Sequence, residues 1–339
     1  MERDILKWEV SQLRTIFLSP TNVCNYLCTM CFNQLAPAPR GFLSWDLFQR
    51  IIHELAAIRA IPASQLSELH FYLDGEPFLH RQYVEMLKYI DEHISGFRVV
   101  VSTNGALLTP DKTDVLLNLH SNSYIYILSL DASNQELYDA VKPRSNFERT
   151  DANTRYFLSR KQELGIRNPH VALQFVVMSI NEHDMGAFYE KWDPLLGPKV
   201  KAAYQLWSDD ILRESGSHIY WKRFHCRSDP FRSDHGLYSG HFGNSPVNGS
   251  EPLICAWPWR ILAIGWNGGL HPCCFFPESK SMLGNIQGRS IQEVFEGERQ
   301  REMRRLFLER KVHDIPVCRD CPKRAWWHDV ELEESLGIR

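Results

Sequence analysis

The chain lacks a long uninterrupted apolar segment and an excess of charge of either sign. None of its apolar runs approaches the ~20 residues that a membrane-spanning helix needs, and residues 1–4 (MERD) do not begin a signal peptide. The 38 Lys and Arg residues nearly balance the 41 Asp and Glu residues, which leaves a formal net charge of -3. Such a chain has no basic field to attract nucleic acid. We therefore expect a cytoplasmic protein with neither a membrane nor a nucleic acid as partner.

The chain has nine cysteines and shows no secretion signal. In that context cysteines favour metal ligands or reactive thiols over a disulfide framework. Three of them, Cys24, Cys28 and Cys31, form a C-x-x-x-C-x-x-C pattern directly after the apolar run TIFL at 15–18. Their thiolates can bind three irons of a 4Fe-4S cluster and leave the fourth iron for another ligand. A zinc knuckle is the alternative, but it requires four ligands, and no His or fourth Cys stands close to these three in the sequence.

Short β-rich runs alternate with helical patterns between residues 14 and 207. This rhythm predicts an α/β fold built from repeated strand–helix units around a parallel sheet. The predicted strands are Thr15–Ser19, Glu68–Leu73, Arg98–Ser102, Tyr124–Leu130, His170–Val177 and Lys201–Leu206. The predicted helices are Trp45–Ala60, Gln82–His93, Asp111–Leu119, Asp151–Leu164 and His183–Leu195. Six such units predict a partial, TIM-like (β/α)6 barrel over residues 1–207, with its functional residues at the carboxyl ends of the strands.

Polar motifs follow three of the predicted strands. The second strand leads into DGEP at 74–77, in which a glycine allows close backbone approach. The third leads into STNG at 102–105, whose short side chains can bind a sugar hydroxyl, and the fourth into SLDA at 129–132, with the basic run KPR ten residues further on. The candidate ligand-binding residues are Asp74, Gly75, Glu76, Pro77, Ser102, Asn104, Ser129, Asp131 and Arg144.

In this order, the cysteine pattern and the strand-end motifs resemble the radical S-adenosylmethionine (SAM) superfamily. The resemblance implies that the amino and carboxylate groups of SAM chelate the open iron. It also implies that residues 74–77 meet the amino group of SAM, although Asp74 stands where the first glycine is usual. By the same resemblance, the STNG motif contacts the ribose, and Ser129 and Arg144 hold the carboxylate, for which the fork of an arginine is well suited.

Two further side chains are candidates for the same site. Met30 stands where the family often packs an aromatic ring against adenine, and a thioether can provide the same packing. Gln174 interrupts an apolar run of the fifth strand, so it either faces the barrel lumen or is a hydrogen-bonded core amide. For the substrate we expect contacts from the lumen, with Tyr72, Gln174, Tyr204 and Trp207 as candidates.

Beyond Trp207 the strand–helix rhythm fails. Residues 208–254 are rich in Gly, Ser, His and Asp and predict a connecting loop, which could serve as a lid. The segment 255–339 carries four spaced cysteines, Cys255, Cys273, Cys318 and Cys321. Their order resembles the Twitch form of the SPASM domain and implies one auxiliary 4Fe-4S cluster with all four irons bound by the protein; a structural zinc site with four cysteines is the alternative. One helix is predicted here, Ser290–Arg310, with its arginines on a solvated face.

The two remaining cysteines are less informative. Cys274 adjoins Cys273 and is expected to be a bystander thiol. Cys226 lies in the predicted connecting loop, where an ordinary loop cysteine is the simpler interpretation. The resemblance adds an alternative, because in radical SAM epimerases a free cysteine donates a hydrogen atom to the substrate radical.

The resemblance implies an enzyme that reductively cleaves SAM to a 5′-deoxyadenosyl radical, which abstracts hydrogen from an unactivated C–H bond. An electron donor such as flavodoxin or ferredoxin would supply the electron. We expect a small-molecule substrate of the sugar, cyclitol or nucleoside type, with the auxiliary cluster oxidising the substrate radical. The alternatives are an epimerase or C–C bond-forming tailoring enzyme, a maturase of a ribosomal peptide and, in a different class, a non-enzymatic iron-sulfur electron carrier.

Overall fold

The computed structural model describes residues 8–31, 33, 39–197, 203–205, 216–223, 255–274, 282–319, 332, 334 and 336. The chain divides into two compact units, each assembled from segments that are distant in sequence. The first unit comprises Met1–Ser19, Leu43–Leu73 and Gly236–Arg339, and the second comprises Pro20–Phe42 and Asp74–His235.

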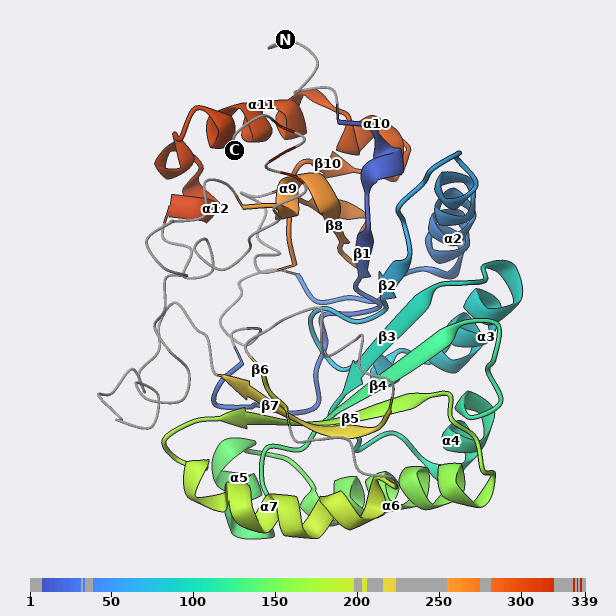
Figure 1. Ribbon diagram of the computed structural model, residues 1–339, viewed down its shortest axis with the longest axis vertical. Coiled ribbons are helices and arrows are strands. Elements are labelled where there is room, and N and C mark those ends of the chain that lie inside the picture. The colour runs from blue at the N-terminus through green and yellow to red at the C-terminus, as the bar shows by residue number, and fades with distance from the viewer. Residues whose placement is uncertain are drawn as a thin grey trace. The chain divides into compact units, whose positions relative to one another are not determined.

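The first unit joins the start of the chain to its end through one sheet. Its strands follow the order β10-β9-β8-β1-β2, in which β1 pairs in parallel with β2 and β8, and β9 pairs antiparallel with β8 and β10 (Figure 1). The strands are β1 (Thr15–Leu18), β2 (Glu68–His70), β8 (Ile261–Ile264), β9 (Gly269–His271) and β10 (Gly284–Asn285). Every residue of β1 is buried, as expected for a strand with neighbours on both edges.

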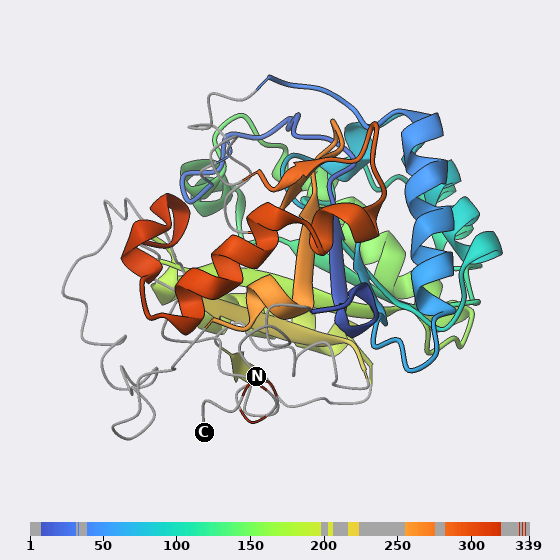
Figure 2. The ribbon, with the colours of Figure 1, turned by 90° about the horizontal axis from the view of Figure 1, so that it is seen from above.

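Helices cover this sheet. Helix α2 begins after Ser44, whose hydroxyl accepts a hydrogen bond from Leu47 N, and it buries an apolar stripe that includes Phe48 and Leu55. Helix α11 packs on the short helix α9, as Figure 2 shows. The helices of this unit are α2 (Trp45–Arg59), α9 (Trp257–Arg260), α10 (Ile291–Phe295), α11 (Glu298–Leu308) and α12 (Pro316–Arg319), with the 3-10 turns η1 (Val10–Gln12) and η8 (Val312–Asp314).

The second unit holds a wholly parallel sheet in the order β3-β4-β5-β7-β6. Its strands are β3 (Arg98–Thr103), β4 (Ser123–Ser129), β5 (His170–Val177), β6 (Ala203–Gln205) and β7 (His218–Arg223). Its helices are α3 (Tyr83–His93), α4 (Pro110–Leu116), α5 (Gln135–Val141), α6 (Phe147–Glu163) and α7 (Met185–Trp192), with the 3-10 turns η3 (Pro77–Leu79), η4 (Glu182–Asp184) and η5 (Asp193–Leu195). Helices α5, α6 and α7 lie along one face of the sheet (Figure 1).

The α/β fold with a parallel sheet is the fold class that the strand–helix rhythm predicts. All six predicted strands are present within a few residues of their expected bounds. The segment 208–254, predicted as a connecting loop, contains the strand β7. This strand pairs directly with β5 and with β6, so β6 lies at the edge of the sheet. The reason is its β-prone run Ile219-Tyr220-Trp221, all of which is buried. The predicted domain boundaries and the lid role remain predictions.

The single helix predicted over 290–310 is two helices, α10 and α11, which meet at Gly297. A Cβ at Gly297 would lie 2.9 Å from the carbonyl oxygen of Glu293, so the chain turns where a side chain does not fit. The prediction that the arginines face solvent is wrong for Arg304. This side chain is fully buried, and its guanidinium donates to Pro258 O at 3.0 Å and to Trp8 O at 3.4 Å. Burial lowers the pKa of Arg304 to about 9.

No helix in the described part of the chain combines the length and the apolar character that crossing a membrane requires.

The place of β7 in the core can be tested at Trp221. Its ring is buried, with its centroid 5.2 Å from that of Phe175 on β5 and 5.7 Å from that of Phe188 on α7. Trp221→Ala should lower the free energy of unfolding by about 3–5 kcal/mol, since it leaves a cavity. Tyr189→Ala removes an exposed aromatic side chain from the same helix and should change it by no more than about 0.5 kcal/mol. Equal urea-unfolding curves for the two variants would contradict a core position for β7.

Candidate functional site

The three cysteines of the C-x-x-x-C-x-x-C pattern lie on one loop of the second unit, residues 20–31, which we call the cluster loop. Cys24 and Cys31 keep solvent-exposed surface, and Cys28 is half-buried. The surrounding protein still displaces enough water to raise the pKa of Cys24 to about 11 and that of Cys28 to about 12, and repulsion between the thiolates adds to both shifts. Such thiols ionise readily only when a cation replaces their protons.

The cluster loop is held by the segment after β4. Leu27 N and Thr29 N donate to Pro143 O at 3.2 Å and to Val141 O at 2.9 Å. Tyr26 is buried in a hydrophobic cluster that also includes Tyr138 of α5, and Cys28 and Met30 pack against that cluster. Met30 therefore packs against the same hydrophobic cluster as Cys28. Its packing against adenine remains a prediction.

The DGEP turn (residues 74–77) approaches the cluster loop as closely as two backbones can. Gly75 has φ +73°, and a Cβ there would lie 2.4 Å from Val23 O. The next residue donates its backbone N–H to the same carbonyl oxygen at 2.8 Å. Only glycine adopts this left-handed φ readily and also fits where there is no room for a Cβ. Asp74, in the position where the family usually has another glycine, is half-buried, and burial raises its pKa to about 7 although Arg40 opposes the shift.

Glu76 links this turn to the end of β3. One carboxylate oxygen accepts from Thr103 Oγ1 at 2.7 Å and from Phe78 N at 3.1 Å, and the other accepts from Asn104 N at 2.8 Å. Burial raises the pKa of Glu76, and these hydrogen bonds oppose the rise. Three of its about four acceptor positions are thus filled by the protein, which fixes the carboxylate in place. Pro77 is buried at the start of η3, where its missing N–H costs nothing.

The predicted ribose-binding motif is mostly turned toward the protein. The side chain of Asn104 donates to Asn25 Oδ1 at 2.9 Å and accepts from Ala106 N at 3.0 Å, so it connects the end of β3 to the cluster loop. Ser102 is half-buried on β3. Contacts of these residues with ribose remain predictions.

Three of the remaining candidates, Ser129, Asp131 and Gln174, converge at the ends of β4 and β5. Gln174 donates to Ser129 Oγ at 2.9 Å, and Asp131, with φ +65°, accepts from Val176 N at 2.6 Å. The cation of this group is Lys142, whose ammonium lies 2.8 Å from the Asp131 carboxylate. Arg144, predicted as the carboxylate ligand, is exposed with φ +62°. Sequence reasoning passed over Lys142 because it preferred the fork of the arginine two residues later in the same KPR run.

The cysteines of the predicted auxiliary site belong to the first unit. Cys255 precedes α9, Cys273 follows β9 and Cys318 lies on α12, all three half-buried, while Cys274 is buried. Cys321, the fourth predicted ligand, and Cys226 lie outside the described residues. Within the described part of the chain, no three His, Cys, Asp or Glu side chains are arranged to hold a single metal ion.

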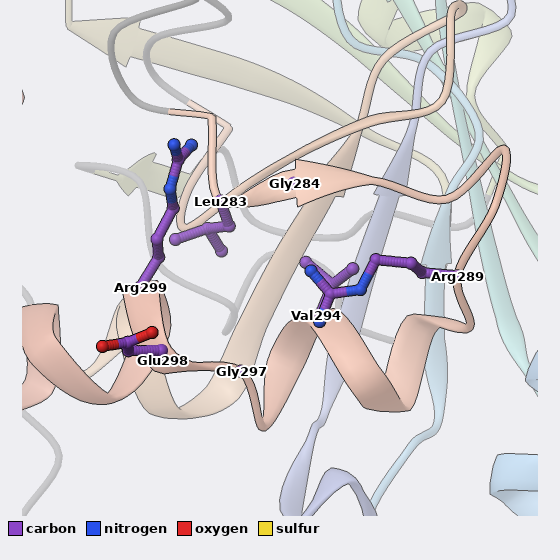
Figure 3. Close-up of a pocket in the computed structure, with 7 residues that line it drawn as sticks. All are labelled: Leu283, Gly284, Arg289, Val294, Gly297, Glu298 and Arg299. Carbon is purple, nitrogen blue, oxygen red and sulfur yellow. The ribbon is translucent and has the colours of Figure 1, made fainter.

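A pocket of about 420 Å³ lies elsewhere in the first unit, at the junction of α10 and α11 (Figure 3). Arg289 and Arg299 line it, but Arg289 donates to Glu293 O and Arg299 to Met282 O, each at 3.0 Å. None of the described residues that line this pocket is a cysteine.

The cluster loop fits a 4Fe-4S cluster on the chemistry of its donors. Its three thiols lie on one short loop, and the surrounding protein raises the pKa of each, which marks a place that favours a cation. Thiolates are the ligands that iron-sulfur clusters use.

Two protein families match the chain. The model of the radical SAM superfamily matches residues 18–191, and that of an iron-sulfur cluster-binding domain, SPASM, matches residues 255–322. Among curated proteins, the subtilosin biosynthesis protein AlbA of Bacillus subtilis is 24% identical over 284 residues, which is 81% of this chain. The chain spans 58% of the length of AlbA.

Solved structures share the fold. BtrN in complex with AdoMet and 2-DOIA matches with a TM-score of 0.52 and 15% identity, over 91% of this chain and 93% of BtrN. The protein anSMEcpe with bound AdoMet and the Cp18Cys peptide matches with a TM-score of 0.55 and 20% identity, over 91% of this chain and 86% of anSMEcpe.

The dependence of the cluster loop on the DGEP turn can be tested at Gly75. Gly75→Ala should displace the loop, so that anaerobically reconstituted protein holds about four irons in place of about eight. Gly96→Ala is the matched control, since Gly96 has the same φ of +73° but nothing within 4 Å of the added Cβ. It should keep all the iron. Full iron content in Gly75→Ala, measured by colorimetric assay, would show that the contact is dispensable.

Proposed function

Because the chain belongs to the radical SAM superfamily and carries an iron-sulfur cluster-binding SPASM domain, we propose that it reductively cleaves SAM and uses the radical to take hydrogen from an unactivated C–H bond. One electron from a donor such as flavodoxin or ferredoxin breaks the sulfur–C5′ bond and gives methionine and a 5′-deoxyadenosyl radical. The observation that carries this proposal is the cluster loop locked against the DGEP turn by Gly75 and Glu76.

Each residue of the site has a positioning role. Cys24, Cys28 and Cys31 would hold three irons of a 4Fe-4S cluster, which would supply the electron for SAM cleavage. The DGEP turn presents its backbone and the fixed carboxylate of Glu76 toward the amino group of SAM. Ser129 and Arg144 receive the carboxylate of SAM. Holding the reacting C–H bond next to the radical carbon and away from water is the main contribution that a protein makes to such chemistry.

The SPASM domain accounts for the fate of the substrate radical. Cys255, Cys273, Cys318 and Cys321 would hold an auxiliary 4Fe-4S cluster with four thiolates, and no iron would be left open to substrate. Such a cluster would take up one electron as the substrate radical loses a proton to solvent. The hydrogen atom removed by 5′-deoxyadenosyl and this electron make the reaction a two-electron oxidation. The substrate is a small molecule of the sugar, cyclitol or nucleoside type, in keeping with the 2-DOIA bound by BtrN, which matches this chain over nearly its whole length.

A peptide is the second candidate substrate. It is favoured by the similarity to anSMEcpe, which was solved with the Cp18Cys peptide, and to AlbA, which serves bacteriocin biosynthesis.

The proposed reaction can be tested without the substrate. Reduced, reconstituted protein should convert SAM to methionine and 5′-deoxyadenosine, measured by mass spectrometry. Cys24→Ala/Cys28→Ala/Cys31→Ala should make none while it retains about four irons of the auxiliary cluster. If this triple variant formed 5′-deoxyadenosine at the wild-type rate, the cluster loop would have no part in the reaction.

The fate of the radical can be tested in deuterated water. With a cyclitol and sugar panel, an oxidation forms product and 5′-deoxyadenosine one to one, places no solvent deuterium in the product and continues in Cys226→Ala. An epimerisation with Cys226 as hydrogen donor places one deuterium at the inverted carbon, because a thiol proton exchanges with solvent. Deuterated product together with an inactive Cys226→Ala would overturn the oxidation. A panel of peptides run in parallel separates the two substrate classes.

A further inference from the structure

The second unit buries one positive charge to which the proposed reaction assigns no role. Lys142 is 1 % exposed, and its ammonium lies 2.8 Å from the carboxylate of Asp131. It also donates a hydrogen bond to Ser129 O and lies 5.1 Å from the centre of the Tyr138 ring. Burial alone would lower the pKa of Lys142, but Asp131 raises it above its ordinary value. The lysine is therefore charged in the folded protein.

The backbone places Lys142 opposite Cys28 of the cluster loop. The residues on either side of Cys28 donate hydrogen bonds to the carbonyl oxygens on either side of Lys142, at 3.2 and 2.9 Å. In antiparallel backbone, two residues enclosed in this way face each other with their side chains on the same side. Both side chains lie at the same hydrophobic cluster: Cys28 packs against it, and the Lys142 ammonium lies over the ring of one of its members, Tyr138.

Because the two residues face each other across this backbone, the charge of Lys142 is directed toward Cys28. A 4Fe-4S cluster gains one negative charge when a flavodoxin-type or ferredoxin-type donor reduces it, so a fixed positive charge next to a ligand favours the reduced form.

We propose that Lys142, held in place by Asp131, is a positioning residue that fixes a positive charge beside Cys28 and thereby raises the reduction potential of the cluster bound by Cys24, Cys28 and Cys31. The inference rests on the proposed function, because it concerns the cluster that cleaves SAM. It gives a function to a lysine whose burial costs desolvation energy. Cluster potentials reach about -700 mV at their low end, where few donors can reduce them.

Three variants separate the effect of the Lys142 charge on the potential from an effect of the substitution on folding. Lys142→Met removes the charge but leaves Asp131 buried without its partner, which is destabilising. Lys142→Met/Asp131→Asn removes both charges, so it tests the proposal even where the single variant fails to fold. Lys142→Arg keeps the charge. The reduced fraction of the cluster is followed by electron paramagnetic resonance during a redox titration of the reconstituted protein. Its signal is isolated by subtracting the spectrum of the matching Cys24→Ala/Cys28→Ala/Cys31→Ala protein.

The expected result is an order of potentials. At a fixed applied potential, Lys142→Met should have a reduced-to-oxidised ratio at least tenfold below that of the wild type, which corresponds to ~59 mV for a one-electron couple. The double variant should lie between the two, because it also removes the negative charge of Asp131, which favours the oxidised form. Lys142→Arg should stay within about twofold of the wild type, since it keeps the charge.

Lys112→Met is the matched control. Lys112 also donates to a backbone carbonyl, Leu107 O at 2.8 Å, and lies 5.7 Å from the centre of an aromatic ring, that of Phe78, but it is not among the main charges that shift the three cysteine thiols. Its removal should leave the potential unchanged. If the lysine only supports the fold, its loss lowers the thermal midpoint without moving the potential. Unchanged potentials in Lys142→Met and in Lys142→Met/Asp131→Asn would overturn the inference. A wild-type protein that makes no 5′-deoxyadenosine would reject the proposed function instead.

Discussion

The cost of ionising three neighbouring thiols in one loop is the constraint on which this site depends. The protein around Cys24, Cys28 and Cys31 displaces water and so opposes the thiolate form of each. Only a strongly cationic group can hold all three as thiolates, and an iron-sulfur cluster is such a group. The positive charge of Lys142 reduces this cost but does not remove it. Binding of the cluster and ordering of the loop are therefore coupled.

The contacts of the cluster loop show how the fold meets this constraint. Gly75 allows the DGEP turn to reach the loop backbone, and Glu76 ties the turn to the end of β3. Asn104 carries the connection back to the loop through Asn25. The ends of β3 and β4 thus form a rigid support on which the cysteines are presented, as a site that positions a reactive cofactor requires.

The sequence predicted the family and fold class correctly because motif spacing and hydrophobic rhythm are local. It missed β7, since a six-residue strand between Gly- and Ser-rich segments leaves little periodicity to detect. It placed Arg304 in solvent, because the contacts that satisfy a buried guanidinium come from residues far away in the chain, Pro258 and Trp8. Lys142 was missed for the same reason: its partner Asp131 and its neighbour Cys28 are brought to it only by the fold.

A 4Fe-4S cluster in the cluster loop, with one iron open to SAM, can be detected by electron paramagnetic resonance of the reduced protein before and after SAM is added. SAM should change the signal of the wild type, because it becomes a ligand of the open iron. It should leave the signal of Cys24→Ala/Cys28→Ala/Cys31→Ala unchanged. A wild-type spectrum that SAM does not alter, in protein with about eight irons, would contradict an open iron in the cluster loop.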